Sequence, residues 1–361
     1  MNKHLLKLPE NRTRRNYLGG AGLDMFKGKS ACIDGDRPEE WLASTVAASN
    51  PGLEPVPDEG LTFVDDAKGG HIRLDRLFES APEFYLGAAH VARRGAKTGF
   101  LAKLLDSAIR LHVQAHPTRA FANARMNCPW GKLECYHILG VRPGFEPYIR
   151  LGFQKPVGRD EWRRIIETQD LAAMDACFER VKVLPGETWH VPGGLPHAIG
   201  EGLLMLEIME PSDLVVRCEF EREGLVVPPQ ARFMGRDLEF SLDIFDYTPR
   251  SVEEVTRRYR REPVILDQGE GFTLLQLSDP RWTDSFLVEK LLLQGGKEMP
   301  YHQQGGFSLC LVSQGAAEIR AEGKMASLLR GECCFAAAAT GELHFRSLHP
   351  GVTEICLIRP G

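Results

Sequence analysis

The stretch GETWHVPGGLPHAIGEG, residues 186–202, places two prolines and several glycines directly before a histidine, His197. Proline restricts φ and glycine permits conformations that other residues avoid, so this combination predicts a tight, rigid turn. Apolar residues flank the turn on both sides, as expected for two buried strands joined by it. A backbone fixed so firmly before one imidazole indicates a structural turn, a metal site, or the base of a nucleophile.

The composition narrows the class of protein. The chain has 361 residues, enough for two domains, and its net charge of −5 argues against general binding to nucleic acid or to anionic membranes. No apolar run reaches the length of a transmembrane helix, and the N-terminus lacks the apolar core of a signal peptide. The sequence therefore predicts a cytoplasmic protein without a membrane or nucleic-acid partner.

The nine cysteines agree with this prediction. Their number is odd, no CxxC pair occurs, and Cys333 and Cys334 are adjacent, which is awkward for a disulfide framework. We therefore expect reduced thiols and no cysteine zinc site, so any metal has to be held by other side chains.

The pattern along the chain is mainly β with helical insertions. Apolar residues at helical spacing predict helix over about 74–110, including FLAKLLDSA, and again over 159–181. Alternating segments at 109–117 and 133–141 predict strands. From about residue 263 onward, short strands separated by glycine-containing turns predict a closing barrel or sandwich.

Four side chains offer nitrogen and oxygen ligands for a metal. Gln114 and His116 lie two residues apart on a predicted strand and so share one face. Glu134 begins the next predicted strand, and His197 follows the rigid turn. These donors suit Zn²⁺, or Fe²⁺, Mn²⁺ or Co²⁺. Each has an alternative structural interpretation when taken alone, because a single strand histidine is more often a surface or core residue than a ligand.

The longer pattern favours the metal. Gly186, Pro192, Gly194 and His197 reproduce the second cupin motif, G-x5-P-x-G-x2-H, whereas His190 lies outside its fixed positions and is predicted to be structural. The chain also resembles the type I mannose-6-phosphate isomerases, which are zinc-dependent cupin enzymes. The blocks that carry the resemblance are FLAKLLDSAIRLHVQAHP (100–117), GKLECYHIL (131–139), VKVLPGETWHVPGGLPHAIGEGLLMLEI (181–208) and PSDLVVRCEF (211–220).

The resemblance implies a fold and a set of site residues. It implies a bicupin of two jelly-roll β-barrels: a catalytic domain over 1–250 and a degenerate cupin-like domain over 251–361 without a metal site, in which His302 stands alone. It implies one zinc ion per chain, with the ligands Gln114, His116, Glu134 and His197. The active-site arginine corresponds to Arg217, the pocket lysine to Lys132, and a serine that holds the sugar phosphate corresponds to Ser44.

Some residues depart from the family pattern. Thr118 and Arg119 follow QAHP where acidic residues are usual, and Glu219 and Phe220 follow Cys218 where an aromatic residue and an aspartate are usual. These changes leave the metal ligands intact and concern the substrate pocket.

The implied reaction is an aldose–ketose isomerisation that interconverts mannose 6-phosphate and fructose 6-phosphate through a cis-enediol. Zinc and Arg217 would stabilise the negative charge on the sugar oxygens. Lys132 is the first choice for the proton-transferring base, with His137 and Glu219 as lesser choices. A non-catalytic sugar-binding cupin and a bicupin dioxygenase remain alternatives, and the chain could be a monomer or a homodimer.

Overall fold

Antiparallel β-sheets dominate the computed structural model, which describes residues 3–65 and 69–361. The first seven-stranded sheet has the order β17 (Arg260–Arg261), β11 (Thr188–Val191), β8 (Glu134–Val141), β13 (Leu203–Met209), β6 (Leu101–Asp106), β3 (Glu39–Leu42) and β2 (Arg12–Thr13). A five-stranded sheet faces it, with the order β10 (Val181–Lys182), β9 (Tyr148–Leu151), β12 (His197–Ile199), β7 (Gln114–Ala115) and β14 (Val216–Arg217).

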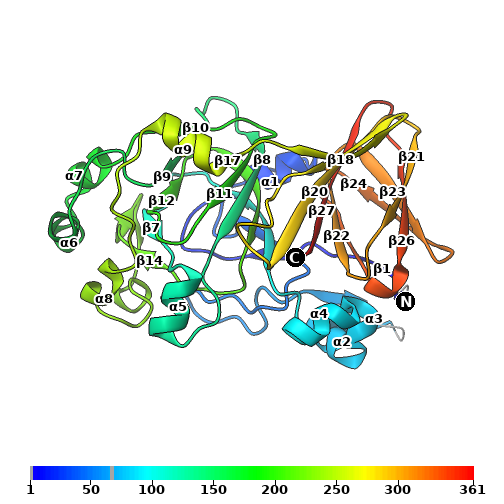
Figure 1. Cartoon of the computed structure of the whole chain (residues 1–361), viewed down its shortest axis with the longest axis horizontal. Helices are drawn as coiled ribbons and strands as arrows, with labels where there is room; N and C mark the ends of the chain where they lie inside the picture. The colour runs from blue at the N-terminus through cyan, green and yellow to red at the C-terminus, as the bar shows by residue number, and fades with distance from the viewer. Residues whose placement is uncertain (1–2, 66–68) are drawn as a thin grey trace.

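Two further sheets form the other half of the molecule. The second seven-stranded sheet has the order β1 (Leu5–Lys7), β25 (Cys333–Ala336), β22 (Ser308–Gln314), β27 (Thr353–Pro360), β20 (Phe286–Leu293), β19 (Phe272–Gln276) and β18 (Val264–Gly269). The four-stranded sheet has the order β21 (Glu298–His302), β26 (Glu342–Ser347), β23 (Ala316–Ala321) and β24 (Lys324–Leu329). Figure 1 shows the two halves side by side, so the mainly β prediction is confirmed.

Hydrophobic cores hold the four sheets together as layers. One core lies between the five-stranded and the first seven-stranded sheet, and another between the second seven-stranded and the four-stranded sheet. A third core joins the two seven-stranded sheets, where Leu104 and Leu206 of the first belong to the same cluster as Leu309 and Phe335 of the second. Burial of these side chains is the main force that fixes the halves against each other.

The helices cover the outside of this layered body. They are α1 (Ala21–Phe26), α2 (Leu74–Ser80), α3 (Pro82–Leu86), α4 (Ala88–Arg94), α5 (Arg119–Met126), α6 (Arg159–Thr168), α7 (Leu171–Ala176), α8 (Leu238–Leu242) and α9 (Val252–Tyr259). The predicted helix over 159–181 is confirmed as α6 and α7. Their apolar side chains, including Trp162 and Met174, pack with Ala198 and Val216 of the five-stranded sheet.

The helix predicted over about 74–110 is correct only in its first part. Helices α2 to α4 end at Arg94, and FLAKLLDSA contains strand β6 instead. All six residues of β6 are buried, because the strand lies in the middle of its sheet with a core on each face. A strand buried on both faces shows no alternation of apolar and polar residues, so its apolar run is easily mistaken for a helical stripe.

Two short strands, one near the N-terminus and one shortly before β18, link the two halves of the molecule. Strand β1 pairs with β25 of the second seven-stranded sheet, through Leu6 opposite Phe335. Strand β17 pairs with β11 of the first, through Arg260 opposite Trp189. The polypeptide thus interlocks the two halves by strand pairing as well as by their shared core.

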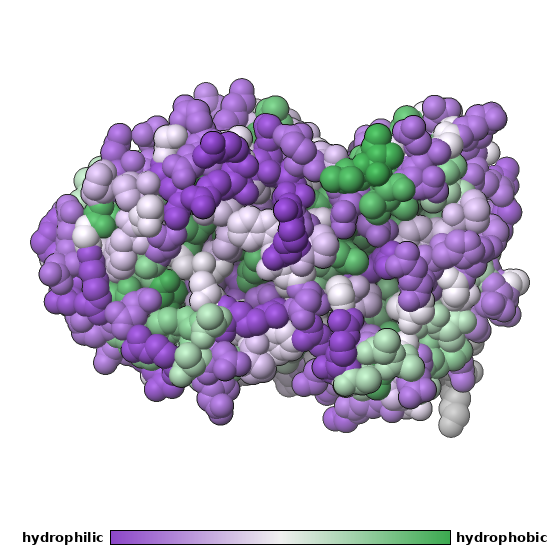
Figure 2. All heavy atoms as spheres, viewed as in Figure 1, coloured by the Kyte–Doolittle hydropathy of each residue, from purple (hydrophilic) through white to green (hydrophobic). Residues whose placement is uncertain are grey.

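The surface is mostly polar on the face drawn in Figure 2, with scattered hydrophobic patches. The edge strand β18 contributes exposed apolar side chains, Val264, Ile265 and Leu266. Among the described residues, no helix is long and apolar enough to span a bilayer.

Candidate metal centre

Three directly paired residues form a row across the five-stranded sheet. Gln114 of β7 pairs with His197 of β12 on one side and with Arg217 of β14 on the other. Directly paired residues of antiparallel strands point to the same face, and His116 shares that face because it lies two residues beyond Gln114. Glu134 approaches from the opposing first seven-stranded sheet, at the start of β8.

The turn in the middle of the GETWHVPGGLPHAIGEG stretch packs against the segment that carries His116. The Gly194 N–H donates a hydrogen bond to the His116 carbonyl, 2.7 Å away. Gly194 has a φ of 91°, which favours glycine, and a side chain on Gly193 would meet the Pro117 carbonyl oxygen at 2.5 Å. The two glycines therefore let the segment before His197 lie directly on the backbone that follows His116.

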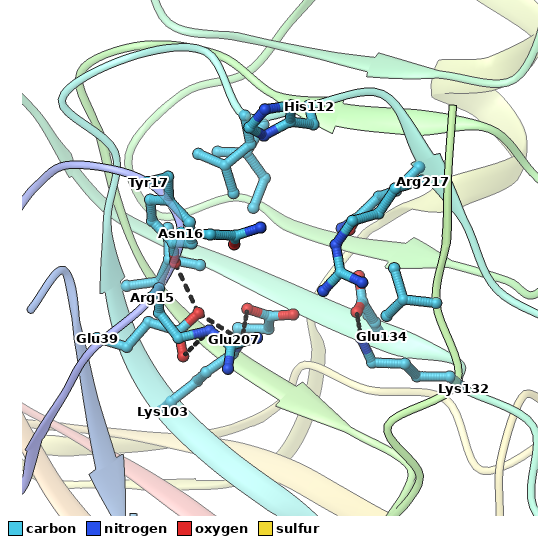
Figure 3. A pocket seen from close by; sticks show the side chains of 15 residues that line it. Arg15, Asn16, Tyr17, Glu39, Lys103, His112, Lys132, Glu134, Glu207 and Arg217 are labelled. Carbon is cyan, nitrogen blue, oxygen red and sulfur yellow. Dashed lines mark hydrogen bonds and ion pairs between the residues drawn. The ribbon is translucent and has the colours of Figure 1, made fainter. Parts of the chain in front are cut away.

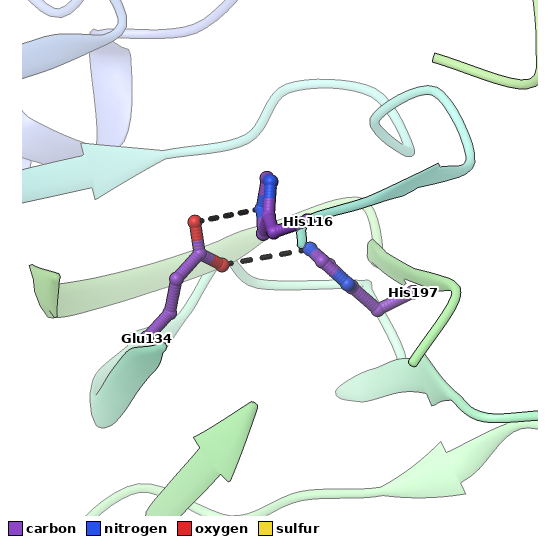
Figure 4. A group of neighbouring side chains, drawn as sticks. All are labelled: His116, Glu134 and His197. Carbon is purple, nitrogen blue, oxygen red and sulfur yellow. Dashed lines mark ion pairs between the residues drawn. The ribbon is translucent and has the colours of Figure 1, made fainter. Parts of the chain in front are cut away.

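Three buried ligating groups converge at this point. His116 Nε2 lies 3.0 Å from Glu134 Oε1, and His197 Nε2 lies 3.5 Å from Glu134 Oε2. Figure 4 shows both imidazoles turned toward the one carboxylate. One ligand atom from each of the three residues lies within 4.8 Å of the others. Gln114 is adjacent, with its Nε2 3.4 Å from His197 Nε2.

The protonation of the cluster suits a cation. His116 Nδ1 lies 2.8 Å from the Leu214 carbonyl and His197 Nδ1 lies 2.9 Å from the Leu195 carbonyl, so each Nδ1–H is the donor and each Nε2 keeps its lone pair. Burial, together with the charge of Lys132, lowers the pKa of His116 to about 3. His116 Nε2 makes no hydrogen bond in the described structure.

The carboxylate at the cluster stays ionised. Burial alone would raise the pKa of Glu134, but the charge of Lys132, whose Nζ lies 3.1 Å from Oε1, contributes to holding it well below the usual value. Two imidazole lone pairs and an anionic carboxylate facing one another without a proton or cation between them are unfavourable. A divalent metal ion would satisfy all three groups at once, so the arrangement fits a metal.

A cavity opens beside the cluster, between the two facing sheets. The empty space in and around it, open solvent included, is about 500 Å³. Figure 3 shows charged side chains reaching into it from several strands. The described lining includes four cations and three carboxylates: Arg15, Lys103, Lys132, Arg217, Glu39, Glu134 and Glu207.

Two carboxylates in the cavity differ in charge although both contact one lysine. Lys103 Nζ lies 2.9 Å from Glu39 Oε1 and 3.0 Å from Glu207 Oε2. Burial disfavours the charge of Glu39, yet Lys103 and Arg15 lower its pKa to about 2. Burial raises the pKa of Glu207 to about 8 in spite of Lys103. The cavity thus holds one carboxylate that stays ionised and one that can exchange a proton near neutral pH.

Two of the three predicted substrate-binding residues line the cavity, and the third does not. Lys132 and Arg217 line the cavity, and Lys132 Nζ lies 3.1 Å from Glu134 Oε1. Arg217 makes no ion pair within the described part of the chain; its Nη1 donates to the Ala231 carbonyl. Burial, reinforced by the charge of Arg15, lowers the pKa of Arg217 to about 10. Ser44 is buried outside the described lining, and its hydroxyl donates to the Val46 carbonyl.

The two lesser choices for a base do not line the cavity. His137 points to the other face of its sheet, where its Nδ1 lies 2.9 Å from the Thr188 hydroxyl. Glu219 is buried in an ion pair with Arg110, 3.0 Å away. Both are therefore separate from the metal cluster.

Several cavity residues were not predicted from the sequence. Lys103 and Glu207 are each a charged residue flanked by apolar residues within a buried strand, in FLAKLL (100–105) and LMLEIM (204–209) respectively. A charged side chain in a buried strand requires a partner of opposite charge. The charges within these two apolar runs were therefore the sequence feature that could have indicated a buried ion pair. Strand register then explains their meeting, because Glu207 of β13 pairs with Lys103 of β6.

Comparisons with known proteins agree with the motifs. No family model matches the chain. Mannose-6-phosphate isomerase ManA of Bacillus subtilis is 37% identical over 123 residues, which are 34% of this chain and 37% of the relative. The chain spans about half or less of the length of the first curated relatives that it matches. The resemblance to mannose-6-phosphate isomerases is thereby confirmed over this segment.

The fold agrees over the whole chain. The crystal structure of the mannose 6-phosphate isomerase from Bacillus subtilis superimposes with a TM-score of 0.71 at 20% identity, covering 98% of this chain and 99% of that one. A mannose 6-phosphate isomerase described as bound with zinc and yttrium gives a TM-score of 0.70 at 17% identity, covering 99% of both chains. The protein therefore has the fold of these cupin-like isomerases.

Proposed function

We propose that the protein is a metal-dependent aldose–ketose isomerase that interconverts mannose 6-phosphate and fructose 6-phosphate. The observation that carries this proposal is the buried cluster of His116, Glu134 and His197, which opens onto a cavity containing Lys132 and Arg217. Relatives that match part of the chain are named mannose-6-phosphate isomerase or probable mannose-6-phosphate isomerase.

Zinc is the metal we propose, with Gln114, His116, Glu134 and His197 as its ligands. Two neutral imidazoles, an amide and one carboxylate are a suitable donor set for Zn²⁺, and the structural neighbour described as bound with zinc supports this choice. When bound, the ion supplies a Lewis acid that polarises the sugar carbonyl.

The chain's own residues would hold the charges of the reaction. Arg217 has a guanidinium free of any carboxylate partner in the described structure, so it is suited to bind the phosphate or an enediolate oxygen. Lys132, beside Glu134, supplies a second cation at the metal side of the cavity. Glu207, with a pKa of about 8, is suited to accept the proton from one sugar carbon and return it to the next.

The same proposal covers the domain organisation, the role of Ser44, the cellular location and the oligomeric state. We interpret the two halves as two jelly-roll barrels of a bicupin, with a catalytic domain over 1–250 and a domain over 251–361 that lacks an internal metal site. The role of Ser44 in phosphate binding stays a prediction, supported by Val46, its hydrogen-bond partner, which lines an adjoining cavity. A cytoplasmic location also stays a prediction, and the chain could act as a monomer or a homodimer.

Removal of the metal tests the proposed function directly. Purified protein treated with a chelator is expected to lose conversion of mannose 6-phosphate and to regain it when Zn²⁺ is added back. Turnover that is insensitive to chelation would exclude the metal mechanism. Bound zinc without turnover of mannose 6-phosphate would support a sugar-binding module instead.

Arg217→Ala separates substrate binding from metal binding. We expect kcat/KM to fall about 10²- to 10³-fold, as when one electrostatic group is removed from an active site, with unchanged zinc content. The exposed Arg236, replaced by alanine, is a matched control that should keep full activity. Loss of zinc from Arg217→Ala would show that this arginine supports the ligands rather than the substrate.

A further inference from the structure

A buried tyrosine lies behind the carboxylate of the metal cluster. Tyr136 follows Glu134 by two residues on β8, so the two side chains share one face of the first seven-stranded sheet. Tyr136 is 1% exposed and packs in the core between this sheet and the five-stranded sheet. Its hydroxyl donates a hydrogen bond to Glu134 Oε2, 2.5 Å away. Tyr136 is absent from the described lining of the cavity, so it reaches the site through Glu134 and not through a substrate.

The hydroxyl of Tyr136 has one partner. A hydroxyl buried in an apolar core costs free energy unless it is hydrogen-bonded, and Glu134 is the only hydrogen-bond partner of this hydroxyl among the described residues. A phenylalanine would fill the same space without needing that partner. The packed ring therefore holds a donor at a fixed point, and this donor restricts the rotation of the flexible Glu134 side chain.

The rotation of this carboxylate matters because each of its oxygens faces a different imidazole. Oε1 lies 3.0 Å from His116 Nε2 and Oε2 lies 3.5 Å from His197 Nε2, as Figure 4 shows. Lys132 Nζ contacts Oε1 at 3.1 Å, whereas Tyr136 holds Oε2. Without the Tyr136 hydroxyl, Oε2 would lose its hydrogen bond and could turn away from His197.

We propose that Tyr136 is a positioning residue that orients Glu134 as a metal ligand and thereby strengthens the binding of Zn²⁺. The inference rests on the metal centre of the proposed function, and it concerns the strength of metal binding rather than the identity of the sugar. The Tyr136 hydroxyl is neutral, unlike the Lys132 ammonium, so it fixes the carboxylate without repelling a metal ion. Hydrogen bonds to ligating groups typically change metal affinity by about 10- to 100-fold.

Tyr17 offers a matched control in the same core. It is 5% exposed, belongs to the same hydrophobic cluster as Tyr136, and donates from its hydroxyl to Glu39 Oε1, 2.6 Å away. Glu39 lines the cavity but does not belong to the cluster of ligating groups. Tyr17→Phe therefore removes the same kind of hydrogen bond from a carboxylate of the same cavity that is not a proposed ligand.

Competition between the metal-free protein and a chromophoric zinc chelator measures the affinity. The wild type and both variants are expected to bind one equivalent. The Kd should rise about 10- to 100-fold in Tyr136→Phe and stay at the wild-type value in Tyr17→Phe. The visible absorption spectrum of the Co²⁺-loaded protein should change only in Tyr136→Phe, because a turned carboxylate alters the coordination geometry. Phenylalanine keeps the ring that packs in the core, and thermal unfolding of the metal-free proteins checks that both variants fold.

These measurements separate the inference from the proposed function. A wild-type Kd in Tyr136→Phe, or an equal rise of the Kd in both variants, would overturn the role of Tyr136 alone. Absence of zinc binding in the wild type would overturn the metal centre itself, and the role of Tyr136 with it. The affinity measurement needs no turnover of mannose 6-phosphate, so a rise confined to Tyr136→Phe supports the inference whichever sugar is converted. If Tyr136→Phe fails to fold, Tyr136→Met, with a flexible apolar side chain, gives the same comparison.

Discussion

The His197→Ala protein is expected to lose the zinc proposed for the cluster of His116, Glu134 and His197, and at least about a thousandfold in the proposed kcat/KM for mannose 6-phosphate. The substitution removes one imidazole whose Nε2 faces Glu134 from 3.5 Å and leaves that buried carboxylate with fewer partners. Lewis-acid stabilisation contributes several kcal/mol to such a reaction, and each 1.36 kcal/mol corresponds to about a factor of ten in rate. Metal analysis and steady-state kinetics on the same preparation measure both effects.

The same stretch of sequence offers a matched control. His190 lies seven residues before His197, but it pairs with Cys135 on β8 and faces the interface between the two seven-stranded sheets. His190→Gln is therefore expected to keep both the zinc and the turnover at neutral pH. Wild-type activity in His197→Ala, or zinc loss in His190→Gln, would contradict the assignment of His197 as the ligand from this stretch.

The proximity of the proposed ligands was predictable in part, because some of its determinants are local. Gln114 and His116 share a face by strand geometry alone, and the glycines and prolines before His197 restrict one turn. The structure adds a reason that the sequence does not contain: Gly193 and Gly194 pack on the backbone at His116 and Pro117. That contact joins segments separated by about 75 residues, so only the fold reveals it.

The cavity was less predictable because its charges meet through strand order. The sequence pattern predicts a helix over the segment that contains Lys103, because β6 is buried on both faces and shows no alternation of apolar and polar residues. Only the pairing of β6 with β13 brings Lys103 to Glu207, and burial, with the neighbouring charges of Glu134 and Glu39, gives Glu207 its raised pKa. Pairing between distant strands and the depth of a carboxyl group are properties of the tertiary structure, and a linear pattern does not encode them directly.

Lowering the pH from about 6.5 toward 4.5 is expected to destabilise the protein strongly, in part through two histidines between the seven-stranded sheets. His137 and His190 are both buried, and burial lowers the pKa of each to about 3. His137 Nε2 and both ring nitrogens of His190 make no hydrogen bond within the described residues. Each histidine is therefore neutral in the folded protein and lacks a partner that would stabilise its charge.

Positively charged neighbours add to the effect of burial. His137 is subject to the charge of Lys290 on β20 and His190 to that of Arg261 on β17, whereas Asp279 acts on His190 in the opposite direction. Because the folded pKa lies below the unfolded value of about 6.5, the unfolded chain takes up protons first as the pH falls. The stability is thus fully present above pH 6.5 and is lost progressively below it, by about 1.4 kcal/mol per pH unit for each histidine.

Urea unfolding at pH 7 and pH 5.5 measures this contribution. Ordinary carboxylates remain ionised in this interval, whereas Glu207, whose pKa is raised in the folded protein, opposes the loss of stability, and the buried His112 and His116 add to it. Comparison of variants therefore isolates the contribution of His137 and His190. The double variant His137→Gln/His190→Gln is expected to lose less unfolding free energy between the two pH values than the wild type, by about 1.2 kcal/mol per histidine over the whole interval. The exposed His71, replaced by glutamine, should leave the wild-type slope unchanged. A double variant with the wild-type pH dependence would show that protonation of the sheet interface does not drive acid unfolding, and that His112 and His116 carry the effect.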